Sequence, residues 1–242
     1  MSGEKSEWFA TWFDSPYYHL LYKHRDDEEA HAFLDVLIDH LDIEEQASML
    51  DLGCGKGRYA KYLNSKGFDV LGIDLAANSI AYAKQFENEH LQFRVHDMRH
   101  PIEGAKFKYI FNLFTSFGYF RTDEEDMAVL RAVRSVIEDD GTFLIDYLNC
   151  NKAIKNLRAE EEAVKDDVSF EIKRWVAEGR IHKQICVKGQ VFKEEVVVIN
   201  LNKFQEYAEA TGFTLSNVYG NYQLDPFNQA ESDRMIMIYT PI

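Results

Sequence analysis

Short apolar runs alternate with helical patterns from residue 47 to residue 148, and this alternation predicts an α/β sheet with parallel strands. Between the runs, helices are expected at 57–67, 78–88 and 122–137, the first ending at Gly67 and the last capped by Thr122 or Asp123. The segment between the last two expected strands, 213–222 and 234–240, is too short for a crossover connection, which indicates that this final pair is antiparallel. The expected strands are 47–50, 69–74, 91–96, 109–114, 142–147, 213–222 and 234–240.

The pattern changes after residue 150. Residues 151–167 are polar and charged, and we expect a solvated helix or loop there. From residue 170 to residue 199, apolar and polar positions alternate between turns at Glu178-Gly179 and Gly189, which predicts an antiparallel meander. We therefore expect a core at 47–150 and 201–242, with an antiparallel β insert at 151–200 after the fifth strand.

The N-terminal residues 1–46 precede the first strand and have no place in the α/β repeat. Residues 8–46 read as helical and rich in aromatic side chains, with Pro16 dividing the segment, and a longer helix is expected from Glu28 to about Leu41. We interpret 1–46 as a helical lid segment over the strand ends. Simple packing on the sheet remains an equal alternative for Trp8, Phe9 and Trp12.

A glycine-rich turn follows the first strand and reads Asp51-Leu52-Gly53-Cys54-Gly55-Lys56-Gly57. Glycines there permit a tight turn and let a ligand lie against the backbone. A dinucleotide fingerprint would place its third glycine at residue 58, which is Arg58, so an NAD site is disfavoured. A tight turn without a ligand is the alternative.

Acidic residues end three successive strands at equal intervals of 23 residues, at Asp51, Asp74 and Asp97. An acid at the tip of the second strand can accept two hydrogen bonds from a ribose diol. NAD enzymes use the same device, so Asp74 indicates a nucleoside without choosing the cofactor.

An acid followed by this glycine spacing resembles motif I of the class I S-adenosylmethionine (SAM) dependent methyltransferases. The resemblance implies a Rossmann-like seven-stranded sheet with its last strand antiparallel, and SAM as cofactor. It also implies that Asp97 accepts from the adenine amino group while Met98 packs on the ring. Arg25 is our candidate partner of the methionine carboxylate, with Tyr22 as a second donor, although Arg25 could instead pair with a neighbouring acid. The predicted cofactor site comprises Tyr22, Arg25, Asp51, Gly53, Cys54, Gly55, Asp74, Leu75, Asp97, Met98 and Leu113.

The segment Phe114–Phe120 resembles the corresponding part of sugar-amine N-methyltransferases. The meander and the aromatic N-terminus resemble that group and the glycine N-methyltransferase-like enzymes, and the whole chain resembles uncharacterised bacterial methyltransferases. Residues 112–115 lack the Pro-Pro pair of enzymes that methylate amide-like nitrogens. These features imply a small acceptor, an amine or a hydroxyl, with Tyr119 as the candidate catalytic residue and His19, Tyr219 and Tyr222 as further candidates.

Two other functions stay open: a non-catalytic SAM-binding or assembly protein, and an NAD-dependent oxidoreductase. The net charge of −14 disfavours a nucleic-acid partner. Three widely spaced cysteines form no zinc motif, and His96 and His100 beside Asp97 have no recognised ligand spacing, so no metal is expected. The polar N-terminus and the lack of a long apolar run predict a cytoplasmic protein without a membrane partner. The β insert is our candidate surface for a homodimer.

Overall fold

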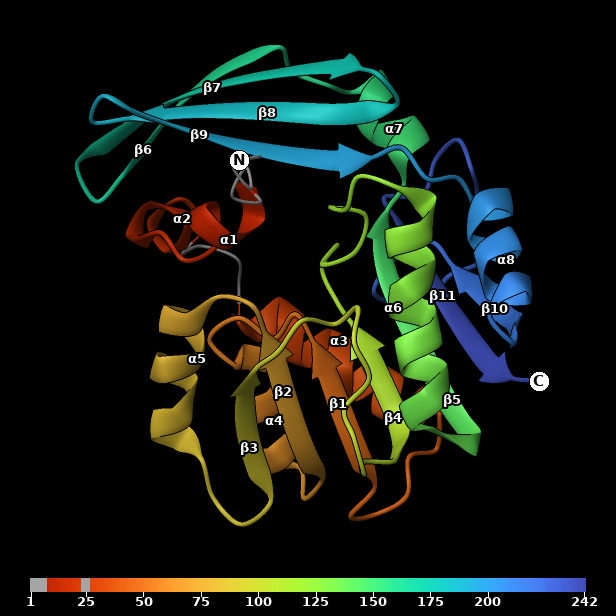
Figure 1. Cartoon of the computed structure of the whole chain (residues 1–242). Coiled ribbons are helices and arrows are strands. Elements are labelled where there is room, and N and C mark those ends of the chain that lie inside the picture. The colour runs from red at the N-terminus through yellow and green to blue at the C-terminus, as the bar shows by residue number, and fades with distance from the viewer. Residues whose placement is uncertain (1–7, 23–26) are drawn as a thin grey trace, which may run out of the picture.

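The computed structural model describes residues 8–22 and 27–242, and its main sheet has the strand order β10-β11-β5-β4-β1-β2-β3. Strands β1 to β5 run parallel, whereas β11 runs antiparallel to both of its neighbours, β5 and β10. The predicted seven-stranded Rossmann-like sheet is confirmed (Figure 1). Its strands are β1 (Ser48–Leu52), β2 (Asp69–Asp74), β3 (Leu91–Val95), β4 (Phe107–Asn112), β5 (Ile137–Leu148), β10 (Phe213–Tyr219) and β11 (Arg234–Pro241).

Both faces of this sheet are covered by helices, which explains why its strands read as unbroken apolar runs. Met49 packs in the core beneath one set of helices, and the next residue, Leu50, packs in the core on the opposite face. On the Met49 side lie α3 (Asp27–His40), α4 (Arg58–Ser65) and α5 (Ala77–Ala83), which continues into the short 3-10 helix η1 (Lys84–Phe86). On the other side lie α6 (Asp123–Val136) and α8 (Leu201–Ala210). Thr122 caps α6, as expected, in a reciprocal capping box with Glu125.

The insert forms a separate four-stranded antiparallel sheet after β5 and the short helix α7 (Cys150–Lys155), which confirms the predicted meander. Its strands are β6 (Glu160–Lys165), β7 (Val168–Ala177), β8 (Arg180–Val187) and β9 (Gln190–Val197). The expectation of helix or loop throughout 151–167 is wrong for β6. That strand lies at the edge of the sheet. Its residues alternate between exposed and partly buried, but Glu160, Glu161 and Glu162 are all charged, so the sequence shows no alternation of polar and apolar residues there.

The N-terminal helices α1 (Trp8–Trp12) and α2 (Pro16–Leu21) lie between the insert and the strand ends of the main sheet (Figure 1). Ser15 caps α2 and Pro16 occupies its first position, which explains the division predicted there. Trp12 is 1% exposed and belongs to an apolar cluster with Phe170 and Ile185 of the insert. The two helices therefore join the insert to the core.

Several boundaries differ from the sequence expectation. The fifth strand begins at Ile137 and not at residue 142, and β10 ends at Tyr219 and not at residue 222. The fourth strand ends at Asn112, not at Phe114, because Phe114 and Thr115 both adopt positive φ angles. The helix expected over 78–88 turns into η1 after Ala83. None of the helices in the described part of the chain is long and apolar enough to cross a membrane.

Candidate functional site

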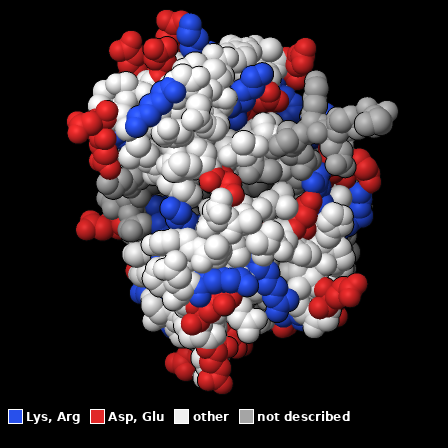
Figure 2. Space-filling model, turned by 60° about the vertical axis from the view of Figure 1, so that its left-hand side comes forward, with Lys and Arg blue, Asp and Glu red and all other residues white. Residues whose placement is uncertain are grey.

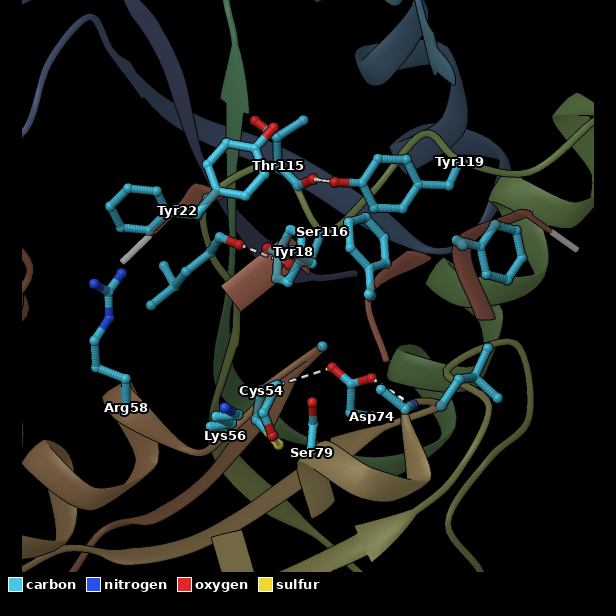
Figure 3. Close-up of a pocket in the computed structure, with 18 of the residues that line it drawn as sticks. Tyr18, Tyr22, Cys54, Lys56, Arg58, Asp74, Ser79, Thr115, Ser116 and Tyr119 are labelled. Carbon is cyan, nitrogen blue, oxygen red and sulfur yellow. Dashed lines mark hydrogen bonds between the residues drawn. The ribbon is translucent and has the colours of Figure 1, made fainter. Parts of the chain in front are cut away.

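A cavity of about 740 Å³ lies at the carboxyl ends of β1, β2 and β4, next to α1 and α2. Its volume falls in the range of about 300–1,000 Å³ that small-molecule sites occupy. The strand order reverses between β1 and β4, and ligands of open α/β sheets bind at such a switch point. We name two of its walls: the loop wall (residues 53–56, 74–76 and 79) and the aromatic wall (Phe9, Phe13, Tyr18, Tyr22 and residues 113–116, 119 and 120). Figure 3 shows Asp74 and Ser79 on one side and Thr115 and Tyr119 on the other.

The three glycines of the loop all adopt positive φ angles, but they serve different purposes. A Cβ on Gly55 (φ +54°) would meet no atom within 4 Å, so its backbone borders open space in the cavity wall. A Cβ on Gly57 (φ +75°) would come within 2.5 Å of the Phe93 ring. A Cβ on Gly53 would come within 2.8 Å of Ser116, so the glycine loop touches the segment that follows β4.

Asp74 lies at the centre of the loop wall. Its carboxylate accepts the backbone N–H of Gly55 and that of Ala76, each at 2.8 Å (Figure 3). Burial raises the pKa of Asp74, and these two amide donors oppose the rise. A carboxylate has about four lone-pair positions, so Asp74, which lines the cavity, can accept further hydrogen bonds from a ligand.

Asp51 is buried beneath the loop and does not line the cavity. Its Oδ2 atom has no hydrogen-bond partner among the described residues. Burial, followed by the nearby charge of Asp74, raises the pKa of Asp51 to about 7. Two acids of the motif therefore lie close together, and burial is the largest cause of the raised pKa of each.

The third acid, Asp97, forms an ion pair with Arg99 at 2.7 Å, and its side chain does not line the cavity. Although burial alone would raise it, the pKa of Asp97 is lowered overall by the hydrogen bonds and charge of Arg99. Met98, the neighbouring residue, does line the cavity, as do Cys54, Leu75 and Leu113. The contact of Asp97 with an adenine ring stays a prediction.

Among the described residues, no group of His, Cys, Asp and Glu side chains is arranged to hold a metal ion.

Tyr22 lines the cavity, but its hydroxyl is bound to the insert. It donates to Glu194 at 2.7 Å and accepts from the Lys183 ammonium. Arg25, the predicted partner of the methionine carboxylate, lies outside the described residues. The role of Tyr22 toward a cofactor therefore stays a prediction.

Glu194 of β9 and Lys183 of β8, which the sequence reasoning missed, face each other across neighbouring strands with a 3.3 Å ion pair. Both side chains are nearly buried, and Glu194 lines the cavity. Trp12 donates its indole N–H to the same carboxylate at 2.6 Å. The sequence did carry a signal for these two residues. They lie on the same face of their strands as Ile185 and Phe192, which are apolar, so a charge at either position is unusual.

Tyr119 stands on the aromatic wall, in ring contact with Trp8 and Phe13 of the first helix and the turn after it. Its hydroxyl donates to the carbonyl oxygen of Thr115 (Figure 3). His19 of α2 also lines the cavity, and burial, with the Lys56 charge, lowers its pKa to about 4. The imidazole is therefore neutral near pH 7.

Among the other residues that the sequence reasoning missed are Arg234, at the start of β11, and Asp146 of β5. Arg234 lines the cavity, and its Nε atom lies 2.6 Å from the Asp146 carboxylate. A charged residue inside the apolar run of β5 was the available signal. Tyr222 also donates to Asp146, at 3.3 Å, whereas Tyr219 binds His40 outside the cavity.

The chain matches a family model described as a methyltransferase domain over residues 43–211. It is similar to a putative methyltransferase, YqeM, of Bacillus subtilis (strain 168), with 31% identity over 108 residues, 43% of each chain. It is also similar to the dTDP-3-amino-3,4,6-trideoxy-alpha-D-glucopyranose N,N-dimethyltransferase of Streptomyces venezuelae, with 26% identity over 102 residues, 42% of this chain and 43% of that protein. The chain spans less than half the length of these two curated relatives.

Solved structures share the fold over nearly the whole chain. An S-adenosylmethionine-dependent methyltransferase from Clostridium acetobutylicum superposes with a TM-score of 0.79 at 16% identity, covering 93% of this chain and 96% of that one. The SAM-bound amino pentose methyltransferase CalS10 from Micromonospora echinaspora gives a TM-score of 0.68 at 18% identity, covering 94% and 98%. At these identities the likeness is one of fold.

Proposed function

This chain belongs to the methyltransferase domain family, and from that premise we propose that it transfers the methyl group of SAM to the nitrogen or oxygen of a small molecule. The family that the motif residues resemble is thereby confirmed. The single observation that carries the proposal is the pairing of the loop wall with the aromatic wall across one cavity. One wall suits a charged nucleoside, and the other suits an organic acceptor.

The loop wall fits SAM in three respects. Open space at Gly55 lets a ligand approach the backbone closely. Asp74 keeps lone pairs for the two ribose hydroxyls. The partnerless Oδ2 of Asp51 supplies negative charge beneath the loop for a cationic cofactor. We propose that these residues, with Cys54, Leu75, Met98 and Leu113, hold the cofactor.

When bound, SAM supplies a methyl group on a positively charged sulfur, which the lone pair of an acceptor displaces in line. The protein has to align the two partners and keep water out. The contact between Gly53 and Ser116 brings the loop wall and the segment after β4 together. We propose that Tyr119, whose hydroxyl proton is held by Thr115, offers its oxygen lone pairs to the acceptor N–H or O–H. The neutral imidazole of His19 is available to accept the proton that the acceptor loses.

Several observations support a small acceptor. Residues of α1, α2 and β9 line one side of the cavity, and its volume of about 740 Å³ suits a small molecule. Among the described residues on the face shown in Figure 2, acidic and basic side chains are interspersed and form no broad basic area. Two curated relatives are named as N,N-dimethyltransferases of dTDP-linked amino sugars. We therefore propose amines first, with amino sugars at the head of the list, and hydroxyl compounds second.

A direct test incubates the protein with SAM and a panel of amino sugars, amino acids, simple amines and hydroxyl compounds, and measures S-adenosylhomocysteine (SAH). We expect SAH formation well above the acceptor-free rate with at least one small compound, and none with DNA, RNA or intact proteins. SAM binding without turnover on this panel or on a metabolite extract would favour the non-catalytic alternative. A thermal shift with NADH and none with SAM would favour an oxidoreductase.

A further inference from the structure

The turn that follows β4 is held in a rare backbone conformation. Phe114 and Thr115 have φ angles of 57° and 60°, and neither is glycine. Two consecutive side-chain-bearing residues in the left-handed region persist only where the surrounding structure fixes them, and such strain clusters at functional sites. The strained pair lies on the aromatic wall of the cavity.

Asp146 of β5 satisfies both strained backbone amides. Its Oδ2 atom accepts the N–H of Phe114 at 2.9 Å, and its own carbonyl oxygen accepts the N–H of Thr115 at 2.9 Å. The Asp146 side chain is completely buried. One residue of the neighbouring strand therefore determines where both amides of the turn point.

Arg234 of β11 completes the arrangement. Its Nε donates to Asp146 Oδ1 at 2.6 Å, and its Nη2 donates to the Thr115 hydroxyl at 3.0 Å. The same hydroxyl oxygen accepts the N–H of Leu148 at 3.1 Å. Buried ion pairs are weak contributors to stability, because desolvation of the two charges offsets their attraction. The Asp146–Arg234 pair is therefore better explained by the backbone that it positions than by a contribution to stability.

The turn connects the ion pair to the site. The carbonyl oxygen of Thr115 accepts a hydrogen bond from the Tyr119 hydroxyl (Figure 3), and Ser116 lies against Gly53 of the loop wall. A shift of the turn would therefore displace Tyr119 relative to the loop wall. Displacements of about 1 Å in such groups can slow a reaction by about a hundredfold.

We propose that Asp146 and Arg234 form a positioning pair, which holds the Phe114–Thr115 turn and, through it, Tyr119 at the correct distance from the bound cofactor. The backbone part of this proposal is independent of the reaction, and its effect on methyl transfer rests on the proposed function. The Thr115 hydroxyl links Arg234 to the turn, so removing this hydroxyl tests the proposal most directly.

The test compares Thr115→Val, which keeps the β-branched shape but removes the hydroxyl, with Thr115→Ser, which keeps the hydroxyl. Arg234→Met removes the guanidinium, and Arg174→Met serves as a control because it breaks a 2.6 Å pair with Glu161 in the insert, away from this cavity. Each full-length variant is saturated with SAH. Its amide exchange at Phe114 and Thr115 is measured by NMR, its SAH affinity by calorimetry, and kcat and KM with the amine that turns over fastest.

We expect Thr115→Val and Arg234→Met to accelerate exchange of the two amides by about tenfold or more, since each loses a hydrogen bond to a charged group. The value of kcat should fall by a similar factor, while SAH affinity stays within about threefold. Thr115→Ser and Arg174→Met should behave as the wild type in all of these measurements. The unchanged SAH affinity and the rescue by serine separate positioning from general loss of structure.

Equal exchange in Thr115→Val and the wild type would overturn the proposal, and so would a Thr115→Ser variant as defective as Thr115→Val. If Arg234→Met fails to fold, the two Thr115 variants decide the matter. If no amine is turned over, the proposed acceptor class fails, and the exchange rates with SAH still decide whether the pair holds the turn.

Discussion

Trp12 and Glu194 are 182 positions apart in the chain, and the indole nitrogen of Trp12 donates to the Glu194 carboxylate at 2.6 Å. Tyr22 donates to the same carboxylate, so a single acid of the insert binds a residue of α1 and the C-cap residue of α2. On the opposite side, Asp14, between these helices, accepts two backbone N–H groups at the start of α5. The N-terminal segment is thus attached to both the insert and the cofactor side of the core.

Glu194→Gln should loosen α1 and α2 without unfolding the core. The change removes a charged acceptor from Trp12 and Tyr22 and the partner of Lys183, and each charge-assisted hydrogen bond contributes about 1.5–3 kcal/mol. Amide exchange over residues 8–22 should accelerate by about tenfold or more, measured by mass spectrometry. Glu195→Gln is the matched control, since Glu195 faces His182 on the outer side of β9. Equal exchange in both variants would mean that Glu194 does not hold these helices.

Asp74→Ala should weaken SAH binding by at least about tenfold, because a charged acceptor for the ribose hydroxyls is lost. Two backbone amides of the loop wall also lose their acceptor, so a modest fall in the melting temperature is expected. Calorimetry gives the affinity directly. Asp69→Ala, at the exposed start of the same strand, should leave the affinity unchanged. Similar affinities for all three proteins would remove Asp74 from the cofactor site.

Alanine substitutions at Gly55 and Gly57 should separate ligand binding from folding. Both glycines have positive φ, so each substitution carries a similar backbone cost of about 1–2 kcal/mol. The added Cβ meets nothing at Gly55 and the Phe93 ring at Gly57. Gly57→Ala should therefore lower the melting temperature more, while Gly55→Ala should weaken SAH binding more. The reverse order would show that the open space at Gly55 is not part of the cofactor site.

Local patterns were enough to predict the main sheet and the insert. Asp51 and Asp74 lie near each other because the carboxyl ends of parallel strands meet at one edge of the sheet. Their contact with a cofactor stays a prediction. Met49 and Leu50 read as a strand because both faces of the sheet are buried. These are short-range rules that one sequence carries in full.

The remaining site depends on long-range pairing, which one sequence does not encode in a readable way. Glu194 binds Trp12, and Arg234 binds Thr115, which is 119 residues earlier. The local segment shows that Glu194 is a charge on an otherwise apolar strand face, but it does not show which distant residue binds it. The carboxylate of Asp97 pairs with Arg99, two residues later, and its contact with an adenine ring stays a prediction.

Asp51 offers a pH test of the cofactor site. Burial and the charge of Asp74 raise the pKa of its carboxyl to about 7 in the free protein, so at pH 6 the group is mostly protonated. A cationic cofactor favours the ionised form, so binding should release a proton below pH 7 and become tighter as the pH rises. Between about pH 6 and 7.5, SAM affinity should increase by about fivefold to tenfold, as expected for one titrating group. This range stays below the pKa of the α-amino group of the ligand, about 7.7–8.0.

The Asp51 test has a matched control in Asp126, another buried carboxyl whose pKa is raised to about 7, chiefly by burial, and which does not line the cavity. Asp51→Asn should abolish both the slope of affinity against pH and the proton release, whereas Asp126→Asn should keep both. Folding stability changes in the opposite sense. Because the folded state holds a proton that the unfolded state loses near pH 4, each of these acids makes the free protein less stable as the pH rises toward 7. Calorimetry of SAM binding in two buffers of different ionisation enthalpy counts the released protons. A slope that survives Asp51→Asn would place the titrating group elsewhere and leave Asp51 with a purely structural role beneath the loop.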